Sequence, residues 1–341
     1  MRTLVISDLH LGGRLQHGVL THPAPLERLL AALDGVQRLV LLGDVVDLLE
    51  GRGEQAMRIA QPVLEAIGRR LGSEREAIVV PGNHDRALID AWIRDTGLRL
   101  QPDTAVALDA SRALGRVTSW LAPARVRVHY PGVWLSDRVW ATHGHYLDRH
   151  LLPVSAYGIA RGLLGRAPRQ RASPIDYELA GGVSLTRLEA WLTRWLPRPL
   201  AALADDLAEL LRAATMPPVP KRLLDRRLAP LFAAALGLQM RRASIPAVVR
   251  VARTLGVDAD WVLFGHVHRL GPLPGDNPPQ WQGTGGRPRL ANTGSWVYEP
   301  LLVHRAVPAH PYWPGGALLL EDGRDPQPLA LLEDLDYSAF H

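Results

Sequence analysis

The segment Thr3-Leu4-Val5-Ile6-Ser7-Asp8-Leu9-His10 decides how this chain is read, because it joins a short aliphatic run to a carboxylate and an imidazole. The aliphatic residues and the abrupt polar ending are typical of a buried β-strand over Thr3–Ser7. Asp8 and His10 stand at positions i and i+2, a spacing that returns both side chains to one face of a strand. The segment therefore predicts a strand whose carboxyl end presents two polar side chains together.

Four later aliphatic runs end in clusters of the same kind. In chain order these clusters are Gly43-Asp44-Val45-Val46-Asp47, Gly82-Asn83-His84-Asp85, His143-Gly144-His145 and Gly265-His266-Val267-His268. The runs before them, expected as strands, are Leu39–Leu42, Ala77–Val80, Val139–Thr142 and Asp260–Phe264. Ligands at the carboxyl ends of strands face one crevice in an open α/β sheet. The five clusters therefore predict a single site.

Helical patterns separate the first strands, which favours βαβ units and a largely parallel sheet. The expected helices are Leu26–Leu33, Ala56–Leu71 and Ala87–Thr96. Further strands are expected at Arg125–His129, Val133–Leu135, Leu290–Asn292, Ala317–Glu321 and Leu329–Leu332. The sequence thus predicts an α/β core.

Between Leu151 and Leu255 the strand pattern stops and only helices and loops are expected. The expected helices are Val183–Leu196, Leu200–Ala214, Arg222–Leu236 and Ala247–Leu255. A helical block between two β-rich parts indicates an insertion into a continuous core. We therefore expect residues 1–148 and 244–341 to form the core, and residues 149–243 to form a helical cap.

The composition limits the kind of site and its surroundings. The chain has no cysteine, so disulfide partners and thiolate metal sites are excluded. Imidazole, carboxylate and amide donors favour Mn, Fe or Zn over a pure Ca or Mg cage. No signal-peptide pattern occupies the N-terminal segment, and no apolar run is long enough to span a membrane. We expect a cytoplasmic protein.

The positive charge is concentrated in the helical block. The segment Arg149–Leu255 holds 17 Lys and Arg against 7 Asp and Glu, whereas the rest of the chain carries a net negative charge. Trp191 and Trp195 lie one turn apart on a Leu-rich helix, which is typical of the core of a small helical subdomain. The alternative is a lipid-binding cap, peripheral at the inner face of the membrane, whose arginines meet anionic headgroups.

The order D-x-H, G-D-x-x-D, G-N-H-D, H-G-H, G-H-x-H resembles the calcineurin-like metallophosphoesterase superfamily, over roughly residues 1–148 and 256–296. The resemblance implies a four-layer αββα sandwich and a centre of two divalent transition-metal ions, with Mn expected first and Fe or Zn as alternatives. It assigns one metal to Asp8, His10, Asp44 and His268, and the other to Asp44, Asn83, His143 and His266. It implies that His84 is a catalytic residue that does not bind the metals, and that Asp47 orients His84.

The motif details are similar to those of the UDP-2,3-diacylglucosamine hydrolase branch. The segments that show this similarity are Ser7–Gly13, Thr142–His145 and Asn292–Trp296. Leu48 and Asp85 differ from the residues that the protein Ser/Thr phosphatases have in their second and third motifs. The branch implies a phosphorylated lipid or small-molecule substrate. Candidate substrate contacts next to the motifs are Arg14, Arg86, His145 and Arg269.

Three functions compete at this point. The first is hydrolysis of a phosphoester or pyrophosphate in a lipid-linked or nucleotide-linked small molecule. The second is a nuclease whose basic segment binds nucleic acid. That segment is rich in Leu and Ala and poor in aromatic residues for base stacking, which disfavours this function. The third, a non-catalytic scaffold, is disfavoured by the complete ligand set.

Overall fold

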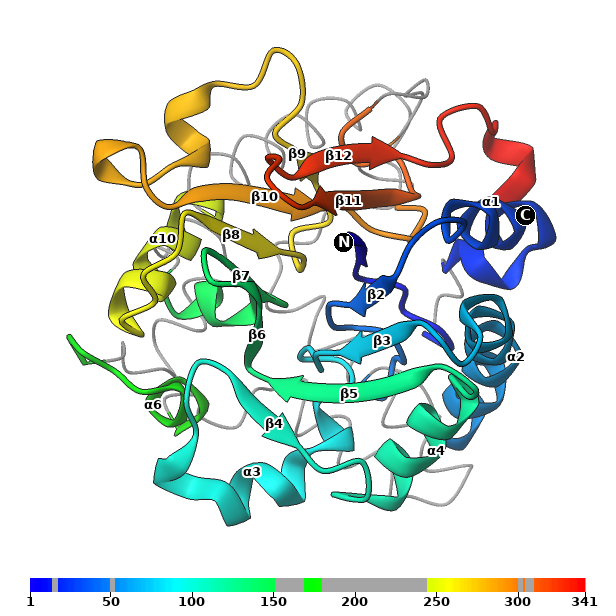
Figure 1. Ribbon diagram of the computed structural model, residues 1–341, viewed down its shortest axis with the longest axis horizontal. Helices are drawn as coiled ribbons and strands as arrows, with labels where there is room; N and C mark the ends of the chain where they lie inside the picture. Colours follow the sequence, from blue (N-terminus) through cyan, green and yellow to red (C-terminus); the bar gives the residue numbers. More distant parts are fainter. Residues whose placement is uncertain are drawn as a thin grey trace, which may run out of the picture.

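Two β-sheets lie between layers of helices (Figure 1). The structure, a computed structural model, describes residues 1–13, 18–49, 53–150, 169–179, 244–299, 303 and 310–340. The first sheet has seven strands in the order β12-β11-β1-β2-β3-β5-β4. Its strands are β1 (Arg2–Ile6), β2 (Arg38–Leu41), β3 (Glu76–Val79), β4 (Thr104–Val106), β5 (Arg125–Tyr130), β11 (Gly316–Glu321) and β12 (Gln327–Ala330). β1, β2, β3 and β5 run parallel, so their carboxyl ends meet at one edge.

The second sheet has five strands in the order β6-β7-β8-β10-β9. Its strands are β6 (Gly132–Ser136), β7 (Val139–Thr142), β8 (Trp261–Phe264), β9 (Leu270–Gly271) and β10 (Arg289–Thr293). β7, β8 and β10 are parallel to one another. Both sheets thus have a parallel centre with antiparallel strands at the margins.

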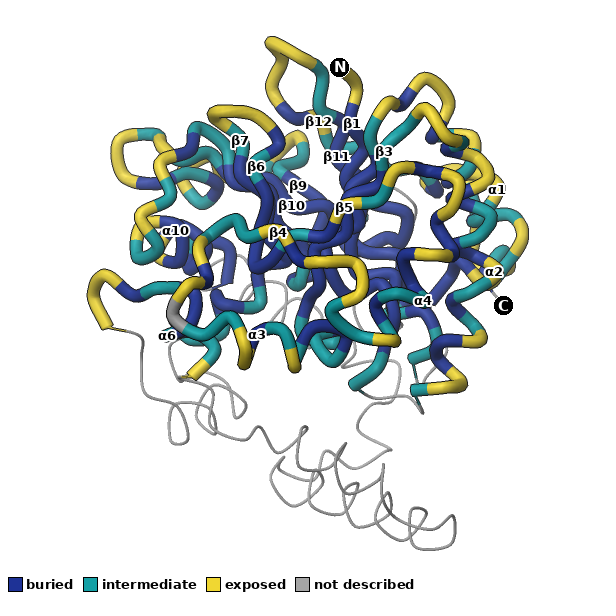
Figure 2. Tube along the Cα trace, turned by 60° about the horizontal axis from the view of Figure 1, so that its bottom comes forward, coloured by how far each residue is buried: buried dark blue, intermediate teal, exposed yellow. Residues whose placement is uncertain are grey.

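Each central strand is buried on both faces, which explains why the strand sequences are continuously aliphatic rather than alternating. In β1, Val5 packs between the two sheets, whereas Leu4 and Ile6 pack on the helical side. Val133 and Leu263 of the second sheet belong to the same inter-sheet core as Val5. Figure 2 shows these strands as the buried centre of the molecule, with exposed residues confined to the periphery.

Helices complete the sandwich on both sides. Helices α1 (Pro23–Ala32), α2 (Gly53–Leu71) and α4 (Arg112–Trp120) pack on the seven-stranded sheet, and α10 (Ile245–Thr254) packs on the five-stranded sheet. The described helices further include α3 (Asp90–Thr96) and α6 (Pro174–Leu179). Short 3-10 segments are η1 (Val19–Thr21), η2 (Arg86–Leu88), η3 (Gly97–Arg99), η4 (His145–His150), η6 (Pro278–Trp281), η7 (Thr284–Gly286) and η8 (Tyr337–Phe340). The expected α/β fold, a four-layer αββα sandwich, is confirmed.

Several local expectations differ from the structure. The helix expected over Ala87–Thr96 is divided into η2 and α3, because Ile89 adopts φ −128° and leaves the helical region. The sequence reading missed β4, β9 and α4; α4 begins at a Ser111 cap that accepts a hydrogen bond from the Leu114 amide at 3.0 Å. The three helices expected between Val183 and Leu236 lie outside the described residues. No helix in the described part of the chain is long and apolar enough to cross a membrane.

The inter-sheet core predicts a large stability cost for truncation. Ile78 is fully buried there, so Ile78→Ala should lower the free energy of unfolding by about 2–5 kcal/mol. Leu108 is 42% exposed, so Leu108→Ala should change the free energy of unfolding by less than about 0.5 kcal/mol. Urea unfolding of both variants measures the difference. Equal midpoints for the two variants would contradict the assignment of Ile78 to the core.

Candidate metal centre

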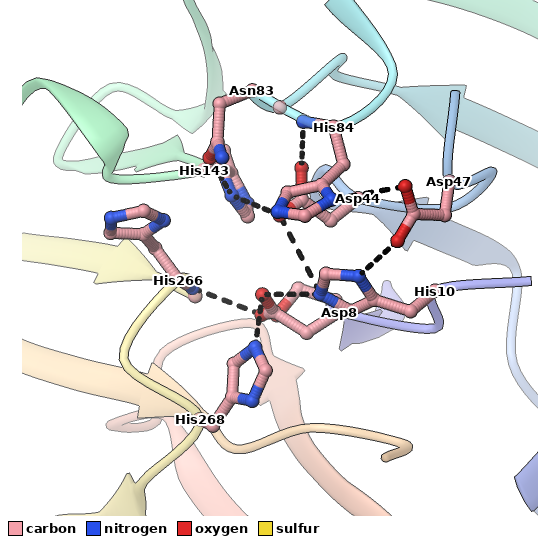
Figure 3. A network of polar contacts seen from close by, with 12 residues as sticks. Asp8, His10, Asp44, Asp47, Asn83, His84, His143, His266 and His268 are labelled. Atoms are coloured by element: carbon pink, nitrogen blue, oxygen red, sulfur yellow. Dashed lines mark hydrogen bonds and ion pairs between the residues drawn. The ribbon is translucent and has the colours of Figure 1, made fainter. Parts of the chain in front are cut away.

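The five polar clusters meet at the edge where the parallel strands of both sheets end (Figure 3). β1, β2 and β3 of the seven-stranded sheet lead into the first three clusters, and β7 and β8 of the five-stranded sheet lead into the other two. The backbone continues its pairing past the strand ends: the Asp8 amide donates to Gly43 O at 3.0 Å and the His10 amide to Asp44 O at 2.9 Å. These bonds fix the register of Asp8 and His10 against Asp44.

Left-handed backbone conformations are concentrated at this site. Of six non-glycine residues with positive φ in the described part of the chain, five belong to the predicted ligand set: Asp8, His10, Asp44, His266 and His268. Such conformations cost about 1–3 kcal/mol each and cluster where the surrounding structure enforces them. The strand-face argument for Asp8 and His10 is therefore wrong in detail. β1 ends at Ile6, and a left-handed turn aims both side chains at the centre.

Glycines stand where the candidate ligands need space. A Cβ on Gly43 would overlap the His143 ring, and one on Gly82 would overlap the Asp44 carboxylate. A Cβ on Gly265 would overlap the side chains of Ser7 and Asp8. The glycine that opens each of these three motifs thus allows another motif's side chain to approach closely.

Asp44 lies at the middle of the cluster and is 1% exposed. Its Oδ2 lies 3.1 Å from His143 Nε2 and 3.7 Å from His10 Nε2, while its Oδ1 accepts a hydrogen bond from the His84 amide at 2.8 Å. Burial by itself raises the pKa of Asp44, but the nearby imidazoles of His143 and His84 outweigh it and hold the pKa well below the usual range. Asp44 therefore stays ionised.

Asp8 is the second buried carboxylate of the centre. Its Oδ2 accepts hydrogen bonds from Ser7 Oγ and from the His266 amide, the latter at 3.0 Å, and its Oδ1 lies 3.2 Å from His268 Nε2. Burial raises the pKa of Asp8, but the attraction of His268 outweighs burial and brings the pKa to about 2. Asp8 thus adds a second negative charge beside that of Asp44.

Hydrogen bonds on the outer nitrogens orient the imidazoles. His143 Nδ1 donates to Leu42 O at 2.9 Å, which directs Nε2 at Asp44. His10 Nδ1 contacts Asp47 at 3.2 Å, which directs Nε2 inward. His10 Nε2 and Asp8 Oδ1 are buried and make no hydrogen bond within the described residues. Buried polar atoms usually have partners, so these two atoms fit a cation.

Asp47 connects His10 with His84. Its Oδ2 contacts His10 Nδ1, and its Oδ1 lies 3.1 Å from His84 Nδ1. Burial raises the pKa of Asp47, but the hydrogen bonds from His10 and His84 outweigh it and hold the pKa below its usual range. The position of Asp47 beside His84 agrees with the predicted pair; the additional contact with His10 was not expected.

Within the described part of the chain, three overlapping groups of side chains could hold a metal ion. They are Asp8/His10/His268, His10/Asp44/His84 and Asp44/His143/His266, with the donor atoms of each group within 4.8 Å of one another. Asp44 belongs to two of them. Asn83 lies beside the third group, since its Oδ1 is 3.2 Å from His143 Nε2. The structure thus brings all seven predicted ligands together, and the geometry also admits His84 as a donor.

The predicted substrate contacts have different surroundings. Arg14 lies outside the described residues. Arg86 is paired with Asp90 and with Glu178, whose Oε2 lies 2.8 Å from Arg86 Nε. Arg269 is 3% exposed and paired with Asp276. The roles of all three in substrate binding stay predictions.

His145, the fourth predicted substrate contact, lies close to the centre. Its ring centroid is 5.6 Å from that of His143, and its Nε2 lies 3.2 Å from the Tyr130 hydroxyl. Burial, together with the nearby His143 and His266, keeps the pKa of His145 well below its usual value. His145 is therefore neutral beside the two negative carboxylates, and its role in binding stays a prediction.

Two carboxylates at the centre, Asp85 and Asp148, were given no role from the sequence. Asp85 accepts hydrogen bonds from the Val45 amide at 2.8 Å and from the Gly82 amide at 2.5 Å, which joins the loops after β2 and β3. Asp148 lies 3.1 Å from His266 Nε2. The signal available in the sequence for Asp148 was a carboxylate three positions after the cluster His143-Gly144-His145.

The crowding at Gly82 predicts a specific loss of metal. Gly82→Ala should push Asp44 and His143 apart and weaken binding of a divalent cation by at least about 10–100-fold, the range seen when ligand orientation is disturbed. Gly115→Ala is the control, because a Cβ on this helical glycine meets nothing closer than 3.6 Å. Titration with Mn²⁺ measures both variants. An unchanged Mn²⁺ affinity in folded Gly82→Ala would contradict the crowding argument.

Comparisons with solved structures and curated proteins add little. A cold-active protein-tyrosine phosphatase of the psychrophile Shewanella SP. is 14% identical, with 96% of this chain and 80% of that chain covered and a TM-score of 0.33. A point mutant of a cold-active protein tyrosine phosphatase is 15% identical, with the same coverage and a TM-score of 0.32. These likenesses are too low to carry an argument. The search of curated proteins gave no significant match.

The family comparison is more informative. Residues 1–164 match the family described as calcineurin-like phosphoesterase. This range contains the first four of the five clusters, from Asp8 to His145, and the fifth follows in the same centre. The match supports placing the chain in the calcineurin-like phosphoesterase superfamily, whose general activity is metal-dependent phosphoester hydrolysis.

Proposed function

We propose that this protein uses two divalent transition-metal ions to hydrolyse a phosphoester or pyrophosphate bond in a lipid-linked or nucleotide-linked small molecule. The observation that carries the proposal is that Asp44 belongs to two groups of side chains that could hold a metal ion, His10/Asp44/His84 and Asp44/His143/His266. One carboxylate shared by neighbouring groups is what a bridged pair of ions requires, and paired ions suit displacement at phosphorus.

The residues divide between two positions. Asp8, His10, Asp44 and His268 would hold one ion, and Asp44, Asn83, His143 and His266 the other. Ions bound there supply Lewis acidity and lower the pKa of water. We take Mn as the first candidate and Fe or Zn as alternatives, because imidazole and carboxylate donors suit these metals.

His84 is the proposed acid–base residue. Its Nδ1 lies 3.1 Å from Asp47 Oδ1, so the carboxylate stabilises a proton on Nδ1 and leaves Nε2 to hold or release the proton of the leaving oxygen. Asp47 stays ionised because the hydrogen bonds from His10 and His84 offset its burial. Asp47 therefore orients the His84 ring and leaves Nε2 for the leaving oxygen.

The substrate class is inferred from the insertion. Its arginine-rich, Leu-rich sequence suits an amphiphile with a phosphate head and an apolar tail, at an anionic membrane surface or in solution. Its described part includes α6, where Glu178 pairs with Arg86, a candidate substrate contact, and accepts hydrogen bonds from the hydroxyls of Tyr130 and Tyr146. A nuclease would instead show turnover that falls steeply with salt. Comparing a small pyrophosphate with single-stranded DNA over a salt series separates the two functions.

The roles of His84 and Asp44 predict opposite behaviour of two variants. His84→Ala should keep both metals and lose about 10²–10⁴-fold in turnover, the usual size of an acid–base contribution. Asp44→Ala should lose metal, because the shared carboxylate is gone. Elemental analysis and turnover of a chromogenic phosphodiester measure both properties. Loss of metal from His84→Ala would contradict its role, and full metal occupancy in Asp44→Ala would contradict the bridge.

The insertion predicts a separation of chemistry from substrate choice. Replacing residues 180–243 by a short Gly/Ser bridge keeps α6 and its contacts, including the Tyr177 ring stacked on Tyr146 at 4.6 Å. This variant should hydrolyse a small phosphodiester at close to the full rate and lose its preference for long-chain substrates. Turnover with short-chain and long-chain analogues measures the effect. A metal-loaded variant with an unchanged chain-length preference would contradict the cap function.

A further inference from the structure

The Asp148 carboxylate lies beside an imidazole of the centre. Its Oδ1 lies 3.1 Å from His266 Nε2, and its side chain is 11% exposed. His266 is otherwise fixed by its backbone: φ is 67°, and its amide donates to Asp8 Oδ2 at 3.0 Å. Since Nε2 faces Asp148, the second ring nitrogen, Nδ1, is left for the group that His266 forms with Asp44 and His143. Figure 3 shows the His266 ring at the margin of the network, with one nitrogen toward His143.

Apolar packing holds the two loops together. Asp148 lies on η4, whose buried residues Tyr146 and Leu147 belong to one hydrophobic cluster with Val267. Val267 is the residue between the two histidines of the fifth motif, so the cluster that fixes η4 also fixes the His266 loop. The turn is closed by the Leu147 amide, which donates to Gly144 O at 2.9 Å. Asp148 is thus placed against His266 by the core rather than by its own contact alone.

We infer that Asp148 is a positioning residue for His266, and this inference rests on the proposed two-metal function. The carboxylate accepts a hydrogen bond from the Nε2–H group, which selects the tautomer with its lone pair on Nδ1 and sets the rotation of the ring. A carboxylate behind a metal-binding imidazole also increases the basicity of the imidazole. Asp148 therefore strengthens metal binding without touching the metal.

The position of Asp148 gives this pair a further consequence. In the chain, η4 follows β7 and His143 and precedes the expected insertion. Its last residue, His150, contacts α6, since His150 Nε2 lies 2.7 Å from the Tyr177 hydroxyl. The Arg250 side chain on α10 donates to His150 O at 2.9 Å. The segment that begins the insertion thus also supports one ligand of the centre.

The test compares metal affinity in three variants and the wild type. Asp148→Ala removes the contact, and Asp148→Asn keeps an acceptor oxygen but removes the charge. Asp103→Ala is the matched control: Asp103 directly precedes β4, at the margin of the sheet, and its Oδ1 forms a similar pair with Nδ1 of His129 on β5 at 2.6 Å. We expect Asp148→Ala to lower the affinity for the more weakly bound of the two Mn²⁺ ions by about 10–100-fold. Asp148→Asn should lie between wild type and Asp148→Ala, and Asp103→Ala should match wild type.

Calorimetric titration with Mn²⁺ and the visible absorption of the Co²⁺-loaded proteins give two readouts that do not depend on activity. The Co²⁺ spectrum should change in Asp148→Ala, since the His266 ring is no longer held. Equal affinities in Asp148→Ala and Asp103→Ala would overturn the inference and leave the proposed function intact. Metal loss as complete as in Asp44→Ala would also overturn it, because Asp148 would then be a ligand. A wild type that binds no metal would contradict both.

Discussion

The buried carboxylate of Asp44, where the two sheets meet, is the constraint on which the rest of the centre depends. An ionised group that is 1% exposed is costly unless positive charge and hydrogen bonds compensate it. The fold supplies the His84 amide, the imidazoles of His10 and His143, and a position for cations. Glycines at the motif starts and left-handed turns at the ligands follow from this crowding, since without them the side chains could not reach one another.

The same constraint shapes the titration of neighbouring groups. Burial lowers the pKa of His143, but Asp44 outweighs burial and raises it to about 9, whereas burial and the charge of Asp44 raise the pKa of Asp85 to about 6. The raised pKa of His143 stabilises the metal-free fold below pH 6.5, and this stabilisation is lost as the pH rises through about 9. Metal binding needs the neutral imidazole, so a bound cation takes over the role of the proton that balances the buried carboxylates.

Much of the fold and the site could be predicted from the sequence because the centre is made of strand ends. Aliphatic runs that stop at Asp, His or Asn predicted β1 and β8 and their convergence. The spacing of Asp8 and His10 led to the right pair for the wrong reason, since a left-handed turn rather than strand alternation joins them. The pairing of Asp148 with His266 was beyond reach, because it depends on packing between distant segments. Helix α4 was missed because Gly115 and Thr118 lower its helix propensity.

The proposed function depends on two metal ions that share the Asp44 carboxylate. Crystals grown with Mn²⁺ and measured at the Mn absorption edge test it most directly, because anomalous scattering locates each ion independently of the ligands assigned to it. We expect two peaks about 3.5–4 Å apart, with the Asp44 carboxylate between them. Asp8, His10 and His268 should surround one peak, and Asn83, His143 and His266 the other. A single peak at full occupancy, or two peaks that do not share Asp44, would contradict it.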